Sequence, residues 1–263
     1  MSNTKGNSSP PVIEMRGVAV GSRKHAGATV AEEVNWTVAA GEFWVVAAPQ
    51  QFGKTDFLMM TGGLTAPDGG DYFFLGERMP IFEEPRLAHR LKLGFVFDGG
   101  LLFSQLTVAE NLALPLRYHG QLAPAEVESR VVALLELTGL TPWANRTAAQ
   151  LGRSWQQRAG LARALGLQPE VLLLDSPLTG LDVRHTSWWL ETLGQLALGH
   201  RFLAGRRLTL VATADDLRPW RRHANRVACL AGQRLSVLGD WPAAENCNDP
   251  IVRELLSGGT SSD

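Results

Sequence analysis

A glycine, a lysine and a threonine stand side by side after an apolar run, and this order of residue types can bind phosphate. Residues 42–48 form the run, residues 49–53 follow as a loop that ends in glycine, and Lys54 and Thr55 come next. In such a loop, backbone N–H groups hold phosphate oxygens, the lysine ammonium reaches the terminal phosphates and the threonine hydroxyl ligates Mg²⁺. Because Gly-Lys-Thr also occurs by chance in surface turns, the assignment depends on the rest of the chain.

A second group of candidate residues lies far along the chain, where another apolar run ends in a carboxylate. Residues 171–174 are all apolar, Asp175 follows them, and the next turn carries a further carboxylate, Asp182. Short continuous apolar runs are typical of strands that are buried on both faces of a parallel sheet. Carboxylate and hydroxyl oxygens suit Mg²⁺. Thr55 and Asp175 are therefore the predicted metal ligands.

The remaining pattern predicts the elements that must position these residues. Strands are expected over residues 12–20, 28–38, 42–48, 92–97, 171–175 and 208–213, with a hairpin over 225–238. Helices are expected over residues 56–62, 108–114, 124–138, 153–166 and 183–197, and residues 66–70 are expected to form a turn. Strands that alternate with helices predict an α/β fold, and the first two strands predict an antiparallel lobe.

The composition limits the class of protein. The chain has 263 residues, 45% of them hydrophobic, and a formal net charge of −1, which gives no electrostatic case for nucleic acid as a partner. Its two cysteines, Cys229 and Cys247, are too few for a disulfide framework and suit a reducing cytosol. No apolar stretch reaches the ~20 residues that span a bilayer, so work at a membrane requires a partner. Residues 1–10 and 258–263 are expected to be disordered ends.

Taken together, these segments resemble the ATP-binding cassette (ABC) transporter ATPases over about residues 11–257. Residues 48–55, 62–70, 106–111, 156–165 and 174–182 carry the resemblance. It implies one domain with a P-loop NTPase-like core, that is, a mostly parallel sheet flanked by helices, together with the antiparallel β lobe and an α-helical subdomain at about residues 100–165. Residues 99–108 and 248–258 are similar to the Mce/Mla branch, which serves lipid transport.

The resemblance also assigns residues to ATP and Mg²⁺. The phosphate loop would contribute Ala48, Gln51, Gly53, Lys54, Thr55 and Asp56, and a segment that meets the γ-phosphate across a dimer would contribute Gly152, Arg153 and Ser154. The family has glycine at positions 48 and 51. At position 51 glycine permits a positive φ and a close approach of the backbone to phosphate, and Gln51 puts this in doubt. The retained Lys54, Thr55 and Asp175 leave Mg-nucleotide binding open.

Three positions that serve catalysis in the family are altered. Asp98 replaces a glutamine, Ser176 replaces the glutamate that polarises the attacking water, and Ala214 replaces a histidine that contacts the γ-phosphate. Loss of a positioned acid or base costs about 10²–10⁴ in rate, and such losses do not simply multiply. The sequence therefore predicts weak or absent hydrolysis. Asp98 and Asp182 remain alternative bases, and Asp98 is otherwise an acid of a solvated loop.

The segment that normally reads Leu-Ser-Gly-Gly-Gln is changed as well. Residues 151–155 read Leu-Gly-Arg-Ser-Trp, which removes a hydroxyl at Gly152 and adds a cation, Arg153, at a helix start. The helix dipole disfavours a cation there by about 0.3–1 kcal/mol, so helix stability does not explain it. A phosphate or an acidic partner are the alternative contacts for Arg153.

These observations lead to three hypotheses for function. The first is a degenerate ATPase subunit of a membrane transport complex for lipids, with a structural or regulatory role. It would dock on a polytopic permease through the helical insert, pair with itself or with an intact ABC ATPase, and lie in the cytoplasm at the inner face of the cell membrane. The second is a scaffold that binds no nucleotide, and the third is a divergent but active ATPase.

Overall fold

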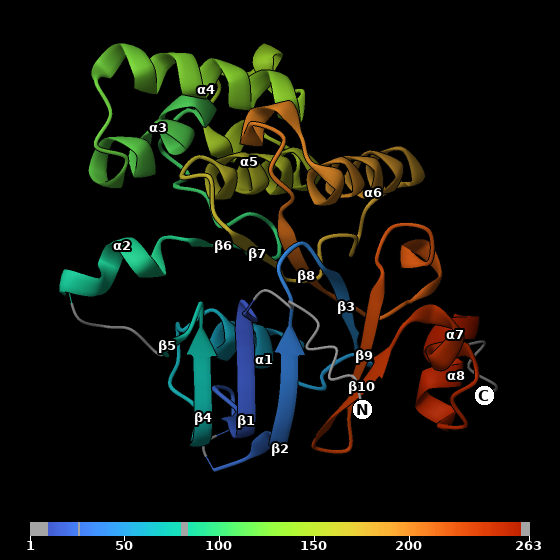
Figure 1. Cartoon of the computed structure of the whole chain (residues 1–263). Helices are drawn as coiled ribbons and strands as arrows, with labels where there is room; N and C mark the ends of the chain where they lie inside the picture. The colour runs from blue at the N-terminus through green and yellow to red at the C-terminus, as the bar shows by residue number, and fades with distance from the viewer. Residues whose placement is uncertain (1–9, 26, 80–83, 259–263) are drawn as a thin grey trace, which may run out of the picture.

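The computed structural model describes residues 10–25, 27–79 and 84–258 (Figure 1). Of the two expected disordered ends, residues 1–9 and 259–263 lie outside the described residues. The described chain forms two sheets with a layer of helices above them in the view of Figure 1. No described helix is long and apolar enough to cross a membrane.

The larger sheet has six strands in the order β10-β9-β3-β8-β7-β6. Its strands are β3 (Phe43–Ala47), β6 (Leu93–Val96), β7 (Val171–Leu174), β8 (Thr209–Ala214), β9 (Arg226–Ala231) and β10 (Arg234–Gly239). All neighbours are parallel except β10, which pairs antiparallel with β9. Every residue of β3, β7 and β8 is buried, as the continuous apolar runs predict. The predicted strands and the C-terminal hairpin are confirmed to within two residues.

The smaller sheet is the predicted antiparallel lobe. Its strands are β1 (Ile13–Gly21), β2 (Thr29–Val38), β4 (Gly69–Phe74) and β5 (Glu77–Arg78), in the order β2-β1-β4-β5. The expected turn over residues 66–70 is wrong at its end, because Gly69 and Gly70 already belong to β4, and Gly69 pairs with Ala19 of β1. Gly70 has φ +79°, and a Cβ on it would lie 2.2 Å from the carbonyl oxygen of Gly17. The glycine pair therefore marks a close approach of two strands.

Helices α3 (Val108–His119), α4 (Pro124–Thr138) and α5 (Arg153–Leu165) lie in the upper layer of Figure 1. A capping box fixes the start of α3: the hydroxyl of Thr107 accepts from the N–H of Glu110, and the Glu110 carboxylate accepts from the N–H of Thr107. Leu112, Leu134 and Leu161 belong to one buried cluster with strands β7 and β8, so the layer packs down on the sheet. The α/β fold class with a helical subdomain is confirmed.

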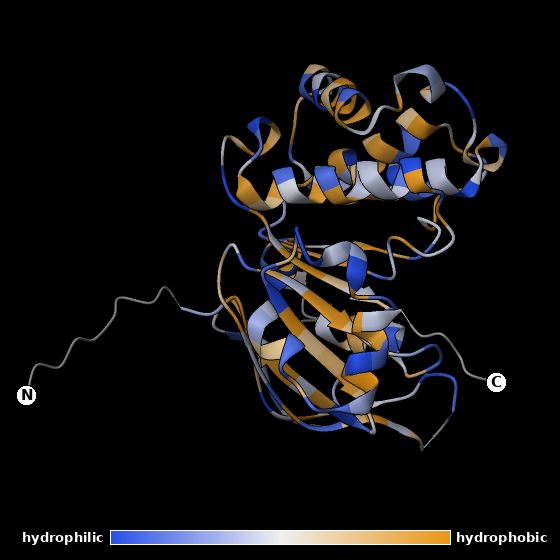
Figure 2. Ribbon diagram, turned by 90° about the vertical axis from the view of Figure 1, so that its right-hand side faces the viewer, coloured by the Kyte–Doolittle hydropathy of each residue, from blue (hydrophilic) through white to orange (hydrophobic). Residues whose placement is uncertain are grey.

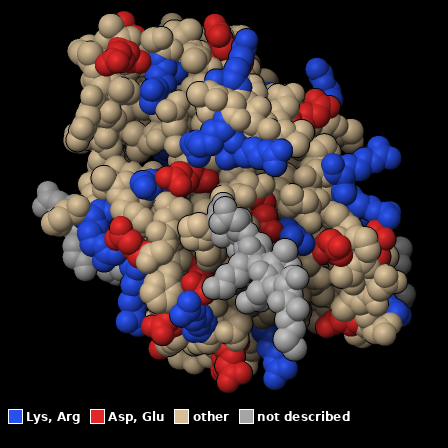
Figure 3. Space-filling view, in the orientation of Figure 1, with Lys and Arg blue, Asp and Glu red and all other residues tan. Residues whose placement is uncertain are grey.

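Five further helices complete the chain. They are α1 (Lys54–Thr61), α2 (Leu87–Arg90), α6 (Val183–Leu198), α7 (Trp241–Glu245) and α8 (Pro250–Ser257). Helix α1 begins two residues before the predicted start, and α2, α7 and α8 were not predicted. Figure 2 shows apolar residues along the inner strands, and Figure 3 shows acidic and basic side chains interspersed on one face. The buried apolar residues form two clusters, which pack on the two faces of the larger sheet.

Candidate phosphate-binding site

The predicted site residues gather at the carboxyl ends of neighbouring parallel strands. Asp175 follows β7, Ala214 ends β8, and the loop after β3 leads into α1. Strand β8 lies between β3 and β7 in the sheet, so these three strand ends are adjacent. Crevices at this edge of an open α/β sheet are the usual place for a ligand. The sheet therefore brings together residues that are far apart in the sequence.

The loop before α1 leaves the helix N-terminus free for an anion. Gly53, the N-cap, has φ +77°, and a Cβ on it would lie 2.5 Å from Cγ1 of Val30, so only glycine fits. No side chain caps α1, and the N–H groups of Lys54, Thr55 and Asp56 have no acceptor in residues 10–25, 27–79 and 84–258. Unpaired N–H groups and the helix dipole together attract phosphate.

Lys54 bends back over this loop. Its Nζ donates to the carbonyl oxygens of Ala48 at 2.8 Å and of Pro49 at 3.0 Å. Burial lowers the pKa of Lys54, while the charges of Asp215 and Asp175 oppose the shift. The ammonium group therefore lies within the loop, where it stiffens the backbone and adds positive charge to the free N–H groups.

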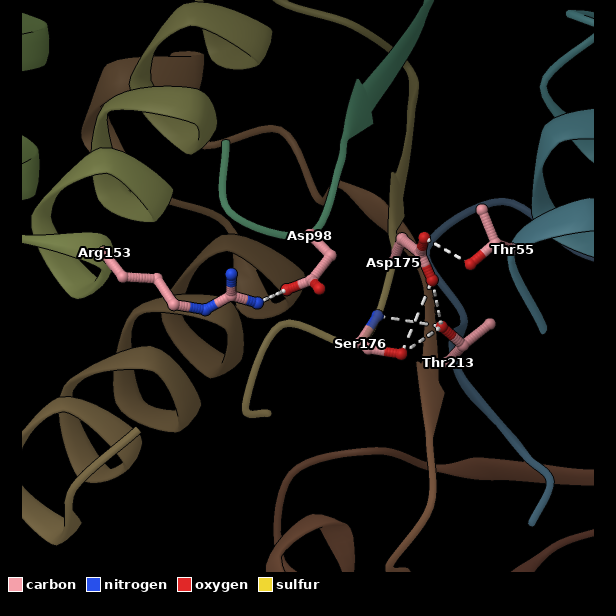
Figure 4. A network of polar contacts seen from close by, with 6 residues as sticks. All are labelled: Thr55, Asp98, Arg153, Asp175, Ser176 and Thr213. Atoms are coloured by element: carbon pink, nitrogen blue, oxygen red, sulfur yellow. Dashed lines mark hydrogen bonds and ion pairs between the residues drawn. The ribbon is translucent and has the colours of Figure 1, made fainter. Parts of the chain in front are cut away.

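Thr55 and Asp175, the two predicted metal ligands, are in contact. The Thr55 hydroxyl donates to Oδ2 of Asp175 at 2.8 Å, and the Thr213 hydroxyl lies 3.2 Å from Oδ1 (Figure 4). Burial raises the pKa of Asp175, which is only 3% exposed, whereas its hydroxyl donors lower that pKa and the nearby charge of Asp98 raises it. A bound divalent cation would offset the cost of burying this carboxylate.

Two residues at the loop and the start of α1 make this region less suited to binding phosphate. Gln51 has φ +67°, the conformation for which glycine is suited, so it holds a strained backbone and keeps its Cβ in the loop. Asp56 is buried in the first turn of α1, and its Oδ2 lies 3.4 Å from the Ser22 hydroxyl. A carboxylate stabilises a helix there but repels phosphate. The free N–H groups, Lys54 and the Thr55–Asp175 pair nevertheless provide the donor set that a Mg²⁺-triphosphate needs.

Two of the positions that the family resemblance assigns to catalysis carry Ser176 and Ala214. Ser176 has φ +47°, and its hydroxyl lies 3.5 Å from Oδ1 of Asp175 and 3.4 Å from the Thr213 hydroxyl. Its N–H donates to the same threonine oxygen at 2.9 Å. Ala214 contributes only its carbonyl oxygen, which accepts from the N–H of Ala48 at 2.9 Å. At these two positions the chain therefore offers a hydroxyl group and a methyl group, neither of which is an acid or a base at neutral pH.

Asp98 and Arg153 form an ion pair within the chain. The Arg153 guanidinium contacts Oδ1 of Asp98, and the two side chains are 52% and 42% exposed (Figure 4). Asp98 lies exposed in the turn after β6, as expected for an acid of a solvated loop, and a cation from α5 contacts it. The acid that Arg153 contacts belongs to the same chain, so contacts of Arg153 with a phosphate or with an acidic partner stay predictions. Gly152 and Ser154 flank Arg153 at the start of α5.

Thr213 is the site residue that sequence reasoning missed. It is fully buried, and its hydroxyl contacts Asp175, receives the Ser176 N–H and lies 3.5 Å from the carbonyl oxygen of Leu174. Its signal in the sequence is a threonine near the end of a strand whose only other polar residue is Thr209. Such a residue gains a role only from the neighbouring strand, so the signal is weak without the sheet order.

Comparisons with known proteins agree with this fold and site. The ABC transporter family profile matches residues 31–179. The chain is 30% identical over 250 residues to the intermembrane phospholipid transport system ATP-binding protein MlaF of Escherichia coli K12, which covers 94% of this chain and 89% of that protein. It is 34% identical over 251 residues to the methionine import ATP-binding protein MetN of Brucella abortus, which covers 94% of this chain and 65% of that protein.

Solved structures are similar as well. A dimeric ATP-binding cassette in a post-hydrolysis state, bound to ADP and Pi, superposes with a TM-score of 0.75 at 26% identity and covers 87% of this chain and 100% of that one. CbiO1 of Clostridium perfringens, part of an ABC transporter complex, superposes with a TM-score of 0.73 at 20% identity and covers 88% of this chain and 89% of that one. The second likeness supports the fold alone.

Proposed function

Because the chain belongs to the ABC transporter family of ATP-binding proteins, we propose that it is the nucleotide-binding subunit of a membrane transport complex in which ATP is bound but hydrolysed slowly or not at all. ATP and Mg²⁺ would occupy the cradle formed by the free N–H groups at the start of α1, Lys54, Thr55 and Asp175. The role would be regulatory or structural, with nucleotide binding stabilising one state of the complex.

One observation carries this proposal. The Thr55 hydroxyl and the Asp175 carboxylate meet at 2.8 Å at the mouth of the phosphate loop, while the next residue, Ser176, directs its hydroxyl at Asp175 and Thr213. The first contact brings two oxygen ligands together at a site with free N–H donors. The serine at position 176 leaves no carboxylate to act as a general base at this position. Binding groups are therefore assembled, and catalytic groups are not.

Each residue of the cradle would have a distinct task. Mg²⁺ would supply charge neutralisation between phosphate oxygens and the Thr55–Asp175 pair. The Lys54 ammonium would exchange its two carbonyl acceptors for phosphate oxygens, which bind a cation more strongly. Thr213 would keep the Asp175 carboxylate in place. Asp56 would reduce affinity by like charge, so we expect weaker binding than a cradle without it would give.

The similarity to MlaF supports lipid transport as the process that the complex serves. The partner would be a polytopic permease, and the docking face would be the helical layer with the loop that precedes it. Leu101 and Phe103 of that loop are 62% and 56% exposed, which suits contact with a protein partner. The chain would then lie at the inner face of the cell membrane through this partner, as a homodimer or paired with an intact ABC ATPase.

Titration of Mg-ATP into the purified chain tests the proposal. We expect saturable binding that Lys54→Ala weakens by about tenfold to a hundredfold, because a charge-assisted hydrogen bond to phosphate is lost. Lys92→Ala is the matched control: this lysine pairs with Glu170 at the opposite end of β6, so its removal should leave affinity unchanged. Far-ultraviolet circular dichroism checks that both variants are folded.

Two outcomes would contradict the proposal in different ways. Absence of Mg-ATP binding in the folded wild-type chain would favour a scaffold that works without nucleotide. Rapid phosphate release that Lys54→Ala abolishes would favour a divergent but active ATPase, in which Asp98 or Asp182 serves as the base. In that case Asp98→Asn or Asp182→Asn should remove the activity.

A further inference from the structure

Two carboxylates lie at the ends of neighbouring strands beside the cradle. Strands β6 and β7 are parallel, with Val96 opposite Leu174, and the N–H of Asp175 donates to the carbonyl oxygen of Val96 at 2.8 Å. Asp98 comes two residues after Val96, and Asp175 comes directly after Leu174. Both side chains are thus held at the same edge of the sheet, where the charge of one acts on the other.

The two carboxylates are compensated in different ways. The carboxylate of Asp175 accepts hydrogen bonds from the hydroxyl groups of Thr55, Thr213 and Ser176. These groups are neutral, so the negative charge of Asp175 remains. Asp98 contacts the guanidinium of Arg153, which cancels its charge. In Figure 4 the Asp98 side chain stands between Arg153 and Asp175. Without the arginine, a second negative charge would face any phosphate in the cradle.

The placement of Arg153 is not explained by the helix that carries it. It is the first residue of α5, at the positive end of the helix dipole, where a cation is disfavoured. Its guanidinium also lies against two glycines: a Cβ on Gly99 would lie 3.3 Å from Nη1, and a Cβ on Gly180 would lie 3.9 Å from Nε. The loops after β6 and β7 therefore leave room for this side chain, and the carboxylate of Asp98 holds it there.

We propose that Arg153 is a positioning residue that neutralises Asp98 and thereby sets the balance between cation and phosphate affinity in the cradle of Lys54, Thr55 and Asp175. The inference rests on the proposed function, because it concerns the same site. It assigns the altered segment at the start of α5 a task within its own chain. The pair also ties the helical layer to the strand end that carries Asp98.

Two probes of opposite charge test the inference on the full chain. One is Mn²⁺ alone, measured by the electron paramagnetic resonance of the free ion, and the other is ATP without metal in EDTA, measured by equilibrium dialysis. In Arg153→Gln, Mn²⁺ should bind more tightly and metal-free ATP more weakly, each by about threefold to thirtyfold at low ionic strength. Asp98→Asn should shift both affinities in the reverse directions, and the double variant should return to within about twofold of wild type.

A control variant separates local from global charge. Arg222→Gln removes one positive charge from an exposed position and should leave both affinities unchanged. Shifts of the same sign for Mn²⁺ and ATP in Arg153→Gln would show a merely structural role and overturn the inference, as would affinities within twofold of wild type in both single variants. If the wild-type chain did not bind ATP, the proposed function would be refuted but this inference would not, because the Mn²⁺ measurements would still decide the role of Arg153.

Discussion

The starts of α1 and α5 make an instructive comparison, because both helices begin with a cation and neither has a side-chain cap. At α1, Lys54 folds back onto the carbonyl oxygens of its own loop, and the N–H groups of the first turn have no acceptor in the described chain. At α5, Arg153 reaches across to Asp98, a carboxylate of the same chain. The cation at the first helix start therefore contacts backbone oxygens of its own loop, whereas the cation at the second pairs with a carboxylate of the same chain.

This difference shows what changing a few side chains can do on an intact scaffold. A free helix N-terminus attracts anions wherever it occurs. Whether it serves a ligand depends on which anion the fold itself supplies. At α5, Asp98 contacts the guanidinium of Arg153. At α1, Asp175 accepts from the Thr55 hydroxyl, and Asp56 lies 3.4 Å from the Ser22 hydroxyl and forms no cap. In the proposed function, the cradle of Lys54, Thr55 and Asp175 would bind the nucleotide, and the start of α5 is the part whose side chains are altered.

The largest expected effect comes from adding one methyl group at the start of α1, and the same addition at the start of α5 is the control. Gly53→Ala should lower the free energy of unfolding by about 2–4 kcal/mol and abolish Mg-ATP binding, because alanine is strained at φ +77° and its Cβ would overlap Val30. Gly152→Ala is the matched variant: Gly152 has φ −64°, and a Cβ there meets nothing within 4 Å, so the change should stay within about 0.5 kcal/mol. Urea unfolding of both variants measures the difference, and equal losses would refute this account of α1.

A smaller effect is expected from Asp175→Asn. Burial raises the pKa of Asp175, so the folded chain holds this proton more tightly than the unfolded chain does. Its ionisation therefore costs stability as pH rises above the unfolded-state pKa of about 3.9. The asparagine variant should be more stable than wild type at pH 7 without metal, should lose Mg²⁺ affinity, and should show no stability gain at a pH below the unfolded-state pKa.

Unfolding by urea at pH 3 and pH 7 in EDTA measures this crossover. Asp98→Asn is the comparison, because its exposed ion pair contributes only about 0–1 kcal/mol and its loss should destabilise at pH 7. If Asp175→Asn were less stable than wild type at pH 7, the hydroxyl contacts of Asp175 would outweigh its burial.

The smallest effect is expected from Ser176→Ala. The Ser176 hydroxyl forms only long contacts, at 3.5 Å with Asp175 and 3.4 Å with Thr213, so its removal should change Mg-ATP affinity by less than about twofold. Phosphate release should stay at the level of the wild-type chain, because a serine hydroxyl is not a base at neutral pH. A clear drop in phosphate release would show that Ser176 takes part in hydrolysis.

The sequence predicted the elements well where the pattern is local. Continuous apolar runs gave β3, β7 and β8 to within two residues, and helical periodicity gave α4 and α5. Strand β4 was missed because its glycine pair is typical of a turn, and it is a strand because it pairs antiparallel with β1. Helices α7 and α8 are short, with five and eight residues, and a short helix shows too little of its period to be recognised.

The candidate site likewise contains some residues that could be identified from the sequence and others that could not. The loop from Ala48 to Thr55 and the residue Asp175 could be identified from type and spacing, because backbone geometry and strand ends fix where such groups lie. The partner of Arg153 could not be identified, since Asp98 is 55 residues away and comes near only when β6 and α5 pack together. Thr213 likewise joins the site only because β8 lies beside β7.

By itself, then, the sequence determined the family, the order of strands and helices, and which polar groups stand at strand ends. Those features follow from hydrophobic periodicity and from residue types that suit one conformation. The tertiary structure alone decided which charges meet, because electrostatic contacts depend on distances between segments that only the packed sheet and helical layer set. Arg153 shows this most plainly: its type was visible in the chain, and its partner was visible only in the fold.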